Sequence, residues 1–96
     1  MFQKLTGFEW DEGNATKNWI KHKVSHLESE QIFFNKPLIV QDDLAHSKSE
    51  ERWFALGKTD KDRRLMTVFT VRKDKIRIIS SRDMSRKERN IYEKEA

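Results

Sequence analysis

The sequence contains no cysteine, one proline and three glycines among its 96 residues. The lack of cysteine excludes disulfide bonds, thiolate nucleophiles and cysteine-based zinc sites, and it fits a reducing cytoplasm. The scarcity of proline and glycine leaves little room for hinges or linkers, and the sequence shows neither internal repeats nor low-complexity tracts. We therefore expect one compact domain that spans residues 1–96.

Long hydrophobic runs are also absent from the sequence. Apolar stretches such as residues 38–40 are far shorter than the roughly 7–15 residues of a signal-peptide core or the roughly 20 residues of a membrane span. Residues 1–6 show no apolar targeting segment either. We therefore expect a soluble, cytoplasmic protein that does not associate with membranes.

Charge is abundant and unevenly distributed along the chain. Residues 1–51 carry six Lys or Arg against nine Asp or Glu, a balance of −3, whereas residues 52–96 carry fourteen against seven, a balance of +7. Three tryptophans and six phenylalanines indicate that the chain folds despite this charge. A basic half is typical of proteins that bind RNA or DNA, and a merely solvated charged surface is the alternative.

The first half of the chain carries two helix-start signals. Asp11 is a suitable N-cap, and Ser25 and Glu28 have the spacing of a capping box, in which the two residues satisfy each other's backbone amides. Pro37 ends any helical continuation. The expected elements are a strand over residues 8–10, a helix from the Asp11 cap to about Lys23, a second helix from Ser25 to about Phe34, and a strand over residues 38–40.

The second half of the chain predicts a β-meander followed by a helix. Residues 52–57 suit a strand, although a helix is possible there, and residues 58–64 form a polar loop. Residues 65–72 and 75–82 are rich in β-branched and large apolar residues, which predicts a hairpin around the turn Lys73-Asp74. Ser85 and Glu88 repeat the capping box and open a terminal helix. The predicted fold class is α+β, with two N-terminal helices, an antiparallel sheet and a C-terminal helix.

A two-residue turn at Lys73-Asp74 also predicts which side chains share a face of the hairpin. It pairs Thr70 with Arg77 and then Val68 with Ile79. The expected core face consists of Leu65, Thr67, Phe69, Val71, Ile76, Ile78 and Ser80. Arg77 then lies in mid-strand on the more open face, where it could bind phosphate, form a cross-strand ion pair or simply face solvent. Arg82 has the opposite parity and joins Arg77 only across a β-bulge.

Several ordered blocks resemble the BrnT family of toxins. The resemblance covers nearly the whole chain, and no single block is a catalytic signature. Lys23 stands where the family pattern has glycine, and Ser81 stands where alanine is usual. The blocks are Phe8-Glu9-Trp10-Asp11-Glu12, Lys17-Asn18, Lys21-His22-Lys23-Val24-Ser25, Asp43, His46-Ser47, Glu51-Arg52, Gly57, Ile76-Arg77-Ile78-Ile79-Ser80-Ser81-Arg82, Glu88-Arg89 and Tyr92.

The resemblance implies a ribonuclease fold like that of RelE and inhibition of translation by RNA cleavage. It also implies neutralisation by a BrnA-type antitoxin with a ribbon-helix-helix DNA-binding region, and therefore a hetero-oligomer of toxin and antitoxin. That complex would repress its own operon, with the DNA contacts supplied by the antitoxin. The alternative is a non-catalytic module that binds nucleic acid or protein.

A ribonuclease that uses no metal attacks the phosphodiester with the 2′-hydroxyl of the RNA itself. Such an enzyme needs cations for the charge that develops on phosphate and a group for proton transfer. Asp42, Asp43 and His46 could hold a divalent metal ion, but three such residues are commonplace in a turn. We therefore expect no metal or other cofactor. The candidate catalytic residues are Arg77, Arg52 and Arg82 as cations, His22 as acid–base group, and Glu51 as a weaker base; the candidate RNA-binding residues are Lys21, Lys17 and Trp53, the last by stacking on a base.

Each candidate also has a plain structural interpretation. His22 could simply favour the dipole at the end of the first helix, and Glu51 and Arg52 could form an ion pair. Lys17 is of a type that is usually solvated. Tyr92 is expected to pack the terminal helix against the sheet, and Trp10 and Trp19 are expected in the core.

Overall fold

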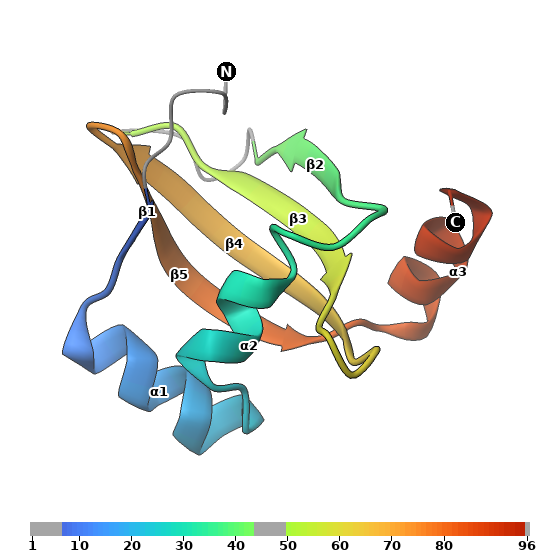
Figure 1. Cartoon of the computed structure of the whole chain (residues 1–96), viewed down its shortest axis with the longest axis horizontal. Helices are drawn as coiled ribbons and strands as arrows, with labels where there is room; N and C mark the ends of the chain where they lie inside the picture. The colour runs from blue at the N-terminus through green and yellow to red at the C-terminus, as the bar shows by residue number, and fades with distance from the viewer. Residues whose placement is uncertain (1–6, 44–49, 96) are drawn as a thin grey trace.

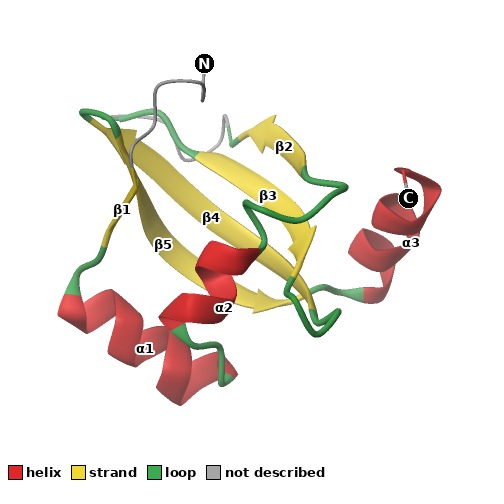
Figure 2. Ribbon diagram, in the orientation of Figure 1, coloured by secondary structure: helices red, strands yellow, loops and turns green. Residues whose placement is uncertain are grey.

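The structure is a computed structural model that describes residues 7–43 and 50–95. A single sheet carries α1 and α2 on one face, while α3 lies at the far end of the sheet (Figure 1). Figure 2 distinguishes the helices, strands and loops by colour. The elements are β1 (Gly7–Glu9), α1 (Glu12–His22), α2 (His26–Gln31), β2 (Ile39–Asp42), β3 (Trp53–Lys58), β4 (Arg64–Arg72), β5 (Lys75–Asp83) and α3 (Arg86–Glu95).

In the part of the chain that the structure describes, the sheet has five strands in the order β1-β5-β4-β3-β2. Strands β2 to β5 pair with one another in antiparallel fashion, as the sequence predicts, and the predicted α+β class with two N-terminal helices and one C-terminal helix is confirmed. The segment at residues 52–57, for which a helix was possible, is strand β3. Strand β1 pairs in parallel with β5, a long-range contact that local sequence patterns do not contain.

The helix starts are those that the sequence predicts. The Asp11 side chain accepts a hydrogen bond from the amide of Gly13, and Ser25 and Glu28 form the reciprocal capping box. The second helix, however, ends at Gln31 and not near residue 34. The amides of residues 33 and 34 bond to carbonyls three residues back, so the chain tightens into a turn there.

Among the described residues, two hydrophobic cores form, one on each side of the sheet. The larger lies beneath α1 and α2, and the smaller lies beneath α3, where Tyr92 is buried as expected and donates a hydrogen bond to the Pro37 carbonyl at 2.6 Å. Trp10 is half buried against the larger core, but Trp19 is 50% exposed, so the expectation that Trp19 is a core residue was wrong. The larger core consists of Val24, Ile32, Trp53, Ala55, Leu65, Phe69, Ile76 and Ile78.

A β-bulge interrupts the hairpin between β4 and β5. The predicted pairing holds from the turn as far as Phe69 with Ile78, but Val68 then pairs with Ser80, so Ile79 is an extra residue. The predicted pair of Val68 with Ile79 was therefore wrong. An inserted residue reverses the side-chain parity of the rest of the strand.

This change of parity moves two predicted positions. Ser81 takes the core position expected for Ser80, and Arg82 joins Arg77 on the opposite face of the sheet. The Ser81 hydroxyl lies 2.8 Å from the Ser29 hydroxyl and 2.9 Å from the Thr67 hydroxyl, all three fully buried. The bulge therefore creates a buried hydrogen-bonded contact between α2 and the sheet.

Helix α1 continues where β1 stops. Strand β1 covers β5 only as far as residue 77, and beyond it the Asn18 side chain accepts a hydrogen bond from the Ser81 amide. Helix α1 thus runs along the edge of β5 from Asp11 toward His22. None of the described helices is long and apolar enough to cross a membrane.

Candidate functional site

The face of the sheet opposite α1 and α2, here called the open face, carries a row of charged side chains. Register pairs Glu9 with Arg77 and Arg77 with Thr70, so the three share this face. Arg52 extends the row, because it precedes β3 and its parity is opposite to that of buried Trp53. We call Glu9, Arg77, Thr70 and Arg52 the arginine row.

Arg77 is held between two carboxylates. One terminal nitrogen donates to Glu9 Oε1 at 2.8 Å, and the other donates to Asp11 Oδ2 at 3.0 Å. Its side chain is only 18% exposed. The ion-pair interpretation of Arg77 therefore holds in the free protein, although a guanidinium has five N–H donors and these two bonds use two of them.

The carboxylates of Asp11 and Glu9 differ in their hydrogen bonds and in their exposure. The amide of Gly13 and, to a smaller degree, Arg77 hold the pKa of Asp11 below its usual value. Asp11 is thus fixed as an ionised helix cap. Glu9 accepts from Arg77 and is 41% exposed, so its carboxylate lies at the surface beside the guanidinium.

A second arginine–carboxylate pair adjoins the row. Arg72 donates to both carboxylate oxygens of Glu50 at 3.2 Å, and this bond lowers the pKa of Glu50, with smaller effects from Arg52 and Arg77. Arg72 contacts this carboxylate directly, and Arg52 and Arg77 are near enough to act on its charge. Arg72 was not among the site residues predicted from the sequence. Its parity on β4 is the same as that of Thr70, and this could have indicated that it lies on the open face.

Glu51 lies next to this cluster with an exposed side chain. Its backbone carbonyl accepts a hydrogen bond from the buried Thr70 hydroxyl at 2.6 Å. This bond fixes the segment before β3 against β4 and so places Arg52 over the sheet. The structure therefore brings the predicted residues Arg77, Arg52 and Glu51 into one neighbourhood.

Arg82 lies on the same face but apart from the arginine row. It pairs with Met66, four residues along β4 from Thr70, which is roughly 13 Å at 3.3 Å per residue. Its guanidinium bonds to both oxygens of Glu88 in α3, at 2.8 and 3.0 Å. Arg82 and Arg77 therefore cannot contact the same phosphate without a rearrangement.

His22 lies at the opposite end of α1 from Asp11, the helix cap that Arg77 contacts. It is the last residue of α1 and is close enough to Asp83 to contribute to lowering the pKa of that carboxyl group, whose main cause is a hydrogen bond from Arg63. Asp83 pairs with Leu65, five residues along β4 from the arginine row, or roughly 16 Å. The structure does not bring His22 together with Arg77.

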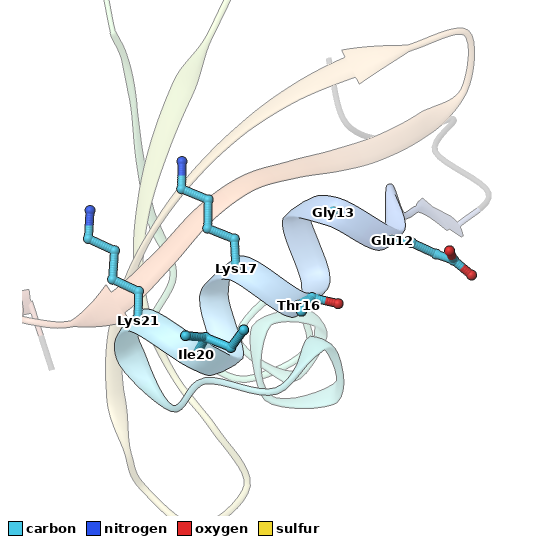
Figure 3. A pocket seen from close by; sticks show the side chains of 6 residues that line it. All are labelled: Glu12, Gly13, Thr16, Lys17, Ile20 and Lys21. Atoms are coloured by element: carbon cyan, nitrogen blue, oxygen red, sulfur yellow. The ribbon is translucent and has the colours of Figure 1, made fainter.

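The predicted RNA-binding lysines lie on the exposed flank of α1. Lys17 and Lys21 are one helical turn apart and line a shallow hollow of about 600 Å³ together with Ile20 and residues of the first turns. Figure 3 shows both lysine side chains extending from the same flank of the helix, with β5 behind them. They form a basic stripe beside the sheet edge.

Trp53 does not suit its predicted role. It is 6% exposed and stacks on Phe69 in the larger core, with ring centroids 5.8 Å apart. Its parity on β3 directs it toward α1 and α2, so it cannot stack on an RNA base. The side chain beside it, Phe54, has the opposite parity and lies on the open face.

A metal centre was not expected from the sequence. Within residues 7–43 and 50–95, no three His, Asp or Glu side chains are grouped so that they could hold a metal ion. Of the turn residues considered for such a site, His46 lies outside the described residues.

Comparison with known proteins agrees with this architecture. The model of a family described as the ribonuclease toxin BrnT of type II toxin–antitoxin systems matches residues 10–88. The fold is similar to the crystal structure of the Brucella abortus ribonuclease toxin BrnT, with a TM-score of 0.63 and 21% sequence identity over 84% of this chain and 99% of that chain. No curated protein sequence matches the chain. Since the family match spans most of the sequence, from the end of β1 into α3, the chain belongs to the BrnT family of ribonuclease toxins of type II toxin–antitoxin systems.

Proposed function

We propose that this chain is a metal-independent endoribonuclease whose cleavage of RNA inhibits translation. The observation that carries the proposal is the position of Arg77, which lies on the open face beside Arg52 and in contact with the surface carboxylate of Glu9. This arrangement joins phosphate-binding cations to a proton acceptor, the two requirements of attack by a 2′-hydroxyl.

In the proposed reaction the 2′-oxygen of the RNA attacks the neighbouring phosphorus. The bond between phosphorus and the 2′-oxygen forms, the bond to the 5′-oxygen breaks, and the products are a 2′,3′-cyclic phosphate and a 5′-hydroxyl. Arg77 and Arg52 stabilise the extra negative charge of the pentacoordinate phosphate, because guanidinium groups match phosphate oxygens in geometry and charge. The donors of Arg77 that the carboxylates do not use supply these bonds.

Glu9 is the carboxylate best placed to accept the proton of the 2′-hydroxyl. Asp11 is committed to the cap of α1, and His22 lies roughly 16 Å away along the sheet. The proton returns to the leaving 5′-oxygen through solvent, which regenerates the free enzyme. Glu51 is the second exposed carboxylate near the arginine row and serves as the comparison for Glu9.

Groups farther from the arginine row hold the flanking RNA. Arg82 on the open face and Lys17 and Lys21 on α1 contact neighbouring phosphates, which makes binding depend on salt concentration.

The protein acts on its RNA substrate in the cytoplasm. The partner of the protein is a cognate BrnA-like antitoxin, which forms a hetero-oligomer with it and supplies any DNA contact.

The proposal is tested with the purified chain, free of antitoxin, and total RNA in the presence of EDTA. We expect the wild type to cleave RNA and the Arg77→Ala variant to lose about 10²–10³-fold in rate, the usual effect of removing one preorganised donor. Arg86→Ala, which removes an exposed arginine on α3, is the matched control. Full activity of folded Arg77→Ala would remove Arg77 from the mechanism, and intact RNA with the wild type would reject the nuclease itself.

The role of Glu9 is tested by comparing Glu9→Gln with Glu51→Gln. Loss of a general base costs typically 10²–10⁴-fold, so Glu9→Gln should fall in that range. Glu51→Gln should retain most of the activity. The reverse ranking would transfer the base to Glu51.

A further inference from the structure

Next to the arginine row, the open face carries a second row that contains an aromatic side chain. Register pairs Gln41 with Phe54, Phe54 with Val68, and Val68 with Ser80, so these four residues lie across β2, β3, β4 and β5 on one face. We call them the aromatic row. It follows the arginine row directly, because Phe54 is two residues from Arg52 along β3.

Phe54 and Val68 are half buried, yet within the described part of the chain they belong to neither hydrophobic core. The side chains before and after Phe54, Trp53 and Ala55, are buried beneath α1 and α2. Phe54 therefore presents an aromatic surface on the face that also carries the phosphate-binding arginines. Strands β2 and β4 flank its position in β3 on either side.

The aromatic row is the last row of the open face before α3. The next row contains Leu56 and Met66, which pair with each other and are covered by Tyr92 of α3 and by Met84. A ligand on the open face thus meets charge on one side of Phe54 and the covered core of α3 on the other. The strip of the open face between the arginine row and the core beneath α3 is therefore one row wide.

The spacing of the two rows matches one nucleotide. Successive side chains on one face of a strand are about 7 Å apart, so Phe54 lies about 7 Å from Arg52 along β3, whereas Arg77 is two strands away across the sheet. A ribose bridges such a span between a phosphate and the base. Aromatic side chains accept any base by stacking, since every base has a π face.

We propose that Phe54, with Val68 beside it, is the platform on which one base of single-stranded RNA stacks when its phosphate binds the arginine row. Gln41 lies at the end of the platform and is the group placed to hydrogen-bond the base edge. The proposal rests on the proposed ribonuclease function, because it assigns the base of the nucleotide that is cleaved there. Phe54, the neighbour of Trp53 on the other face of β3, thus takes the stacking role that the sequence suggested for Trp53.

The test measures binding without cleavage, so that it does not depend on the reaction. The probes are a short fluorescent 2′-O-methyl oligouridylate, which has no free 2′-hydroxyl, and an abasic 2′-O-methyl ribose-phosphate chain of the same length. The proteins are the wild type, Phe54→Ala, Phe54→Leu and Phe54→Tyr, each checked for folding. Phe34→Ala is the matched control, because Phe34 is 77% exposed away from the open face and contacts the Phe8 ring.

We expect Phe54→Ala to weaken binding of the oligouridylate by roughly 5- to 100-fold, the usual effect of losing one stacked base. Phe54→Leu, which keeps an apolar side chain of similar size, should lose nearly as much, while Phe54→Tyr and Phe34→Ala should bind like the wild type. The abasic chain should bind all variants equally weakly, since it has no base to stack. This coupling between the side chain and the base is what a purely structural role would not produce.

Two results would overturn the proposal. One is a folded Phe54→Leu variant that binds oligouridylate as tightly as the wild type. The other is an equal loss of affinity for the base-bearing and abasic chains, which would make Phe54 a structural residue. If the wild type leaves RNA intact in EDTA but the coupling is present, the nuclease proposal fails and the platform remains.

Discussion

Replacing Arg63 by methionine should markedly destabilise the fold. Arg63 lies in the polar loop before β4, where the sequence suggested no role. Its guanidinium donates to the backbone carbonyls of His22 and Lys23 at the end of α1, at 3.2 and 2.8 Å. It also forms ion pairs with Glu28 of α2 at 3.1 Å and with Asp83 of β5 at 2.7 Å. One side chain therefore connects both N-terminal helices to the sheet.

The magnitude follows from these contacts. The two ion pairs contribute about 0.2–1 kcal/mol each, with the Asp83 pair toward the lower end because that carboxylate is 54% exposed. The two hydrogen bonds to carbonyls at the C-terminal end of α1, where backbone carbonyls have no partner within a helix, contribute about 1 kcal/mol each. The sum is about 2–4 kcal/mol, which lowers the melting temperature of a domain of this size by roughly 10–30 °C. Methionine keeps the apolar stem, so the loss isolates the guanidinium.

The measurement is thermal and urea unfolding followed by circular dichroism at neutral pH, with Arg86→Met as the control for loss of an exposed arginine. A fall of less than about 0.5 kcal/mol, the range of ordinary surface substitutions, would refute the reasoning. An equal fall in both variants would show that net charge, and not the contacts of Arg63, is responsible.

The dependence on pH provides a second check. The hydrogen bond from Arg63 lowers the pKa of Asp83. At Glu28, burial favours a higher pKa, but the hydrogen bonds from Ser25 and Arg63 together outweigh burial, so the pKa of Glu28 is lowered as well. A lowered folded-state pKa adds stability that is present above the ordinary values of 3.8 and 4.5 and is lost as the pH falls through the lower folded values. The difference in stability between wild type and Arg63→Met should therefore be constant near neutral pH and should shrink below about pH 4.

Three further substitutions test the packing and the departures from the family pattern. Gly57→Ala should destabilise the fold by about 1–3 kcal/mol in urea unfolding, because a Cβ there would lie 2.8 Å from Ile32 Cβ. Wild-type stability of this variant would show that the turn after α2 moves to accommodate the methyl group without cost. Lys23→Gly should stabilise by about 0.5–1 kcal/mol, because Lys23 has φ = 56°, in the left-handed region that favours glycine; a loss of stability would mean that the contact of Lys23 with the Trp19 ring outweighs this strain. Ser81→Ala should cost about 1–3 kcal/mol, because it removes the shared partner of two buried hydroxyls, and an unchanged midpoint would count against that network.

Elements of the fold that depend on local interactions could be predicted from the sequence. Helix caps at Asp11 and Ser25, the turn at Lys73-Asp74 and the alternation along β4 each involve neighbouring residues, and each is present in the structure. The extra residue Ile79 could not be predicted in the same way. A bulge is decided by how the whole strand fits its neighbours, and one inserted residue exchanges the faces of all that follow.

The candidate site shows the same division. Arg77 was recognisable because an arginine in an apolar strand needs a partner, and the alternation of β4 and β5 placed it on the open face. Its partners were not recognisable, because β1 joins the sheet in parallel with β5 and brings Glu9 beside Arg77 from 68 positions away. The exclusion of His22 and Trp53 from the site likewise depends on where α1 ends along β5 and on which face β3 buries.

The sequence by itself determined the α+β class, the BrnT family and the arginines that carry the charge, since composition, local periodicity and ordered blocks are properties of the chain. Only the tertiary structure decided which carboxylates those arginines meet. Glu9, Asp11 and Glu50 come from the acidic half and pair with Arg77 and Arg72 of the basic half, so part of the charge asymmetry is used within the molecule. The physical reason is that such pairs form between strands and loops distant in sequence, whose proximity is set by strand order and register.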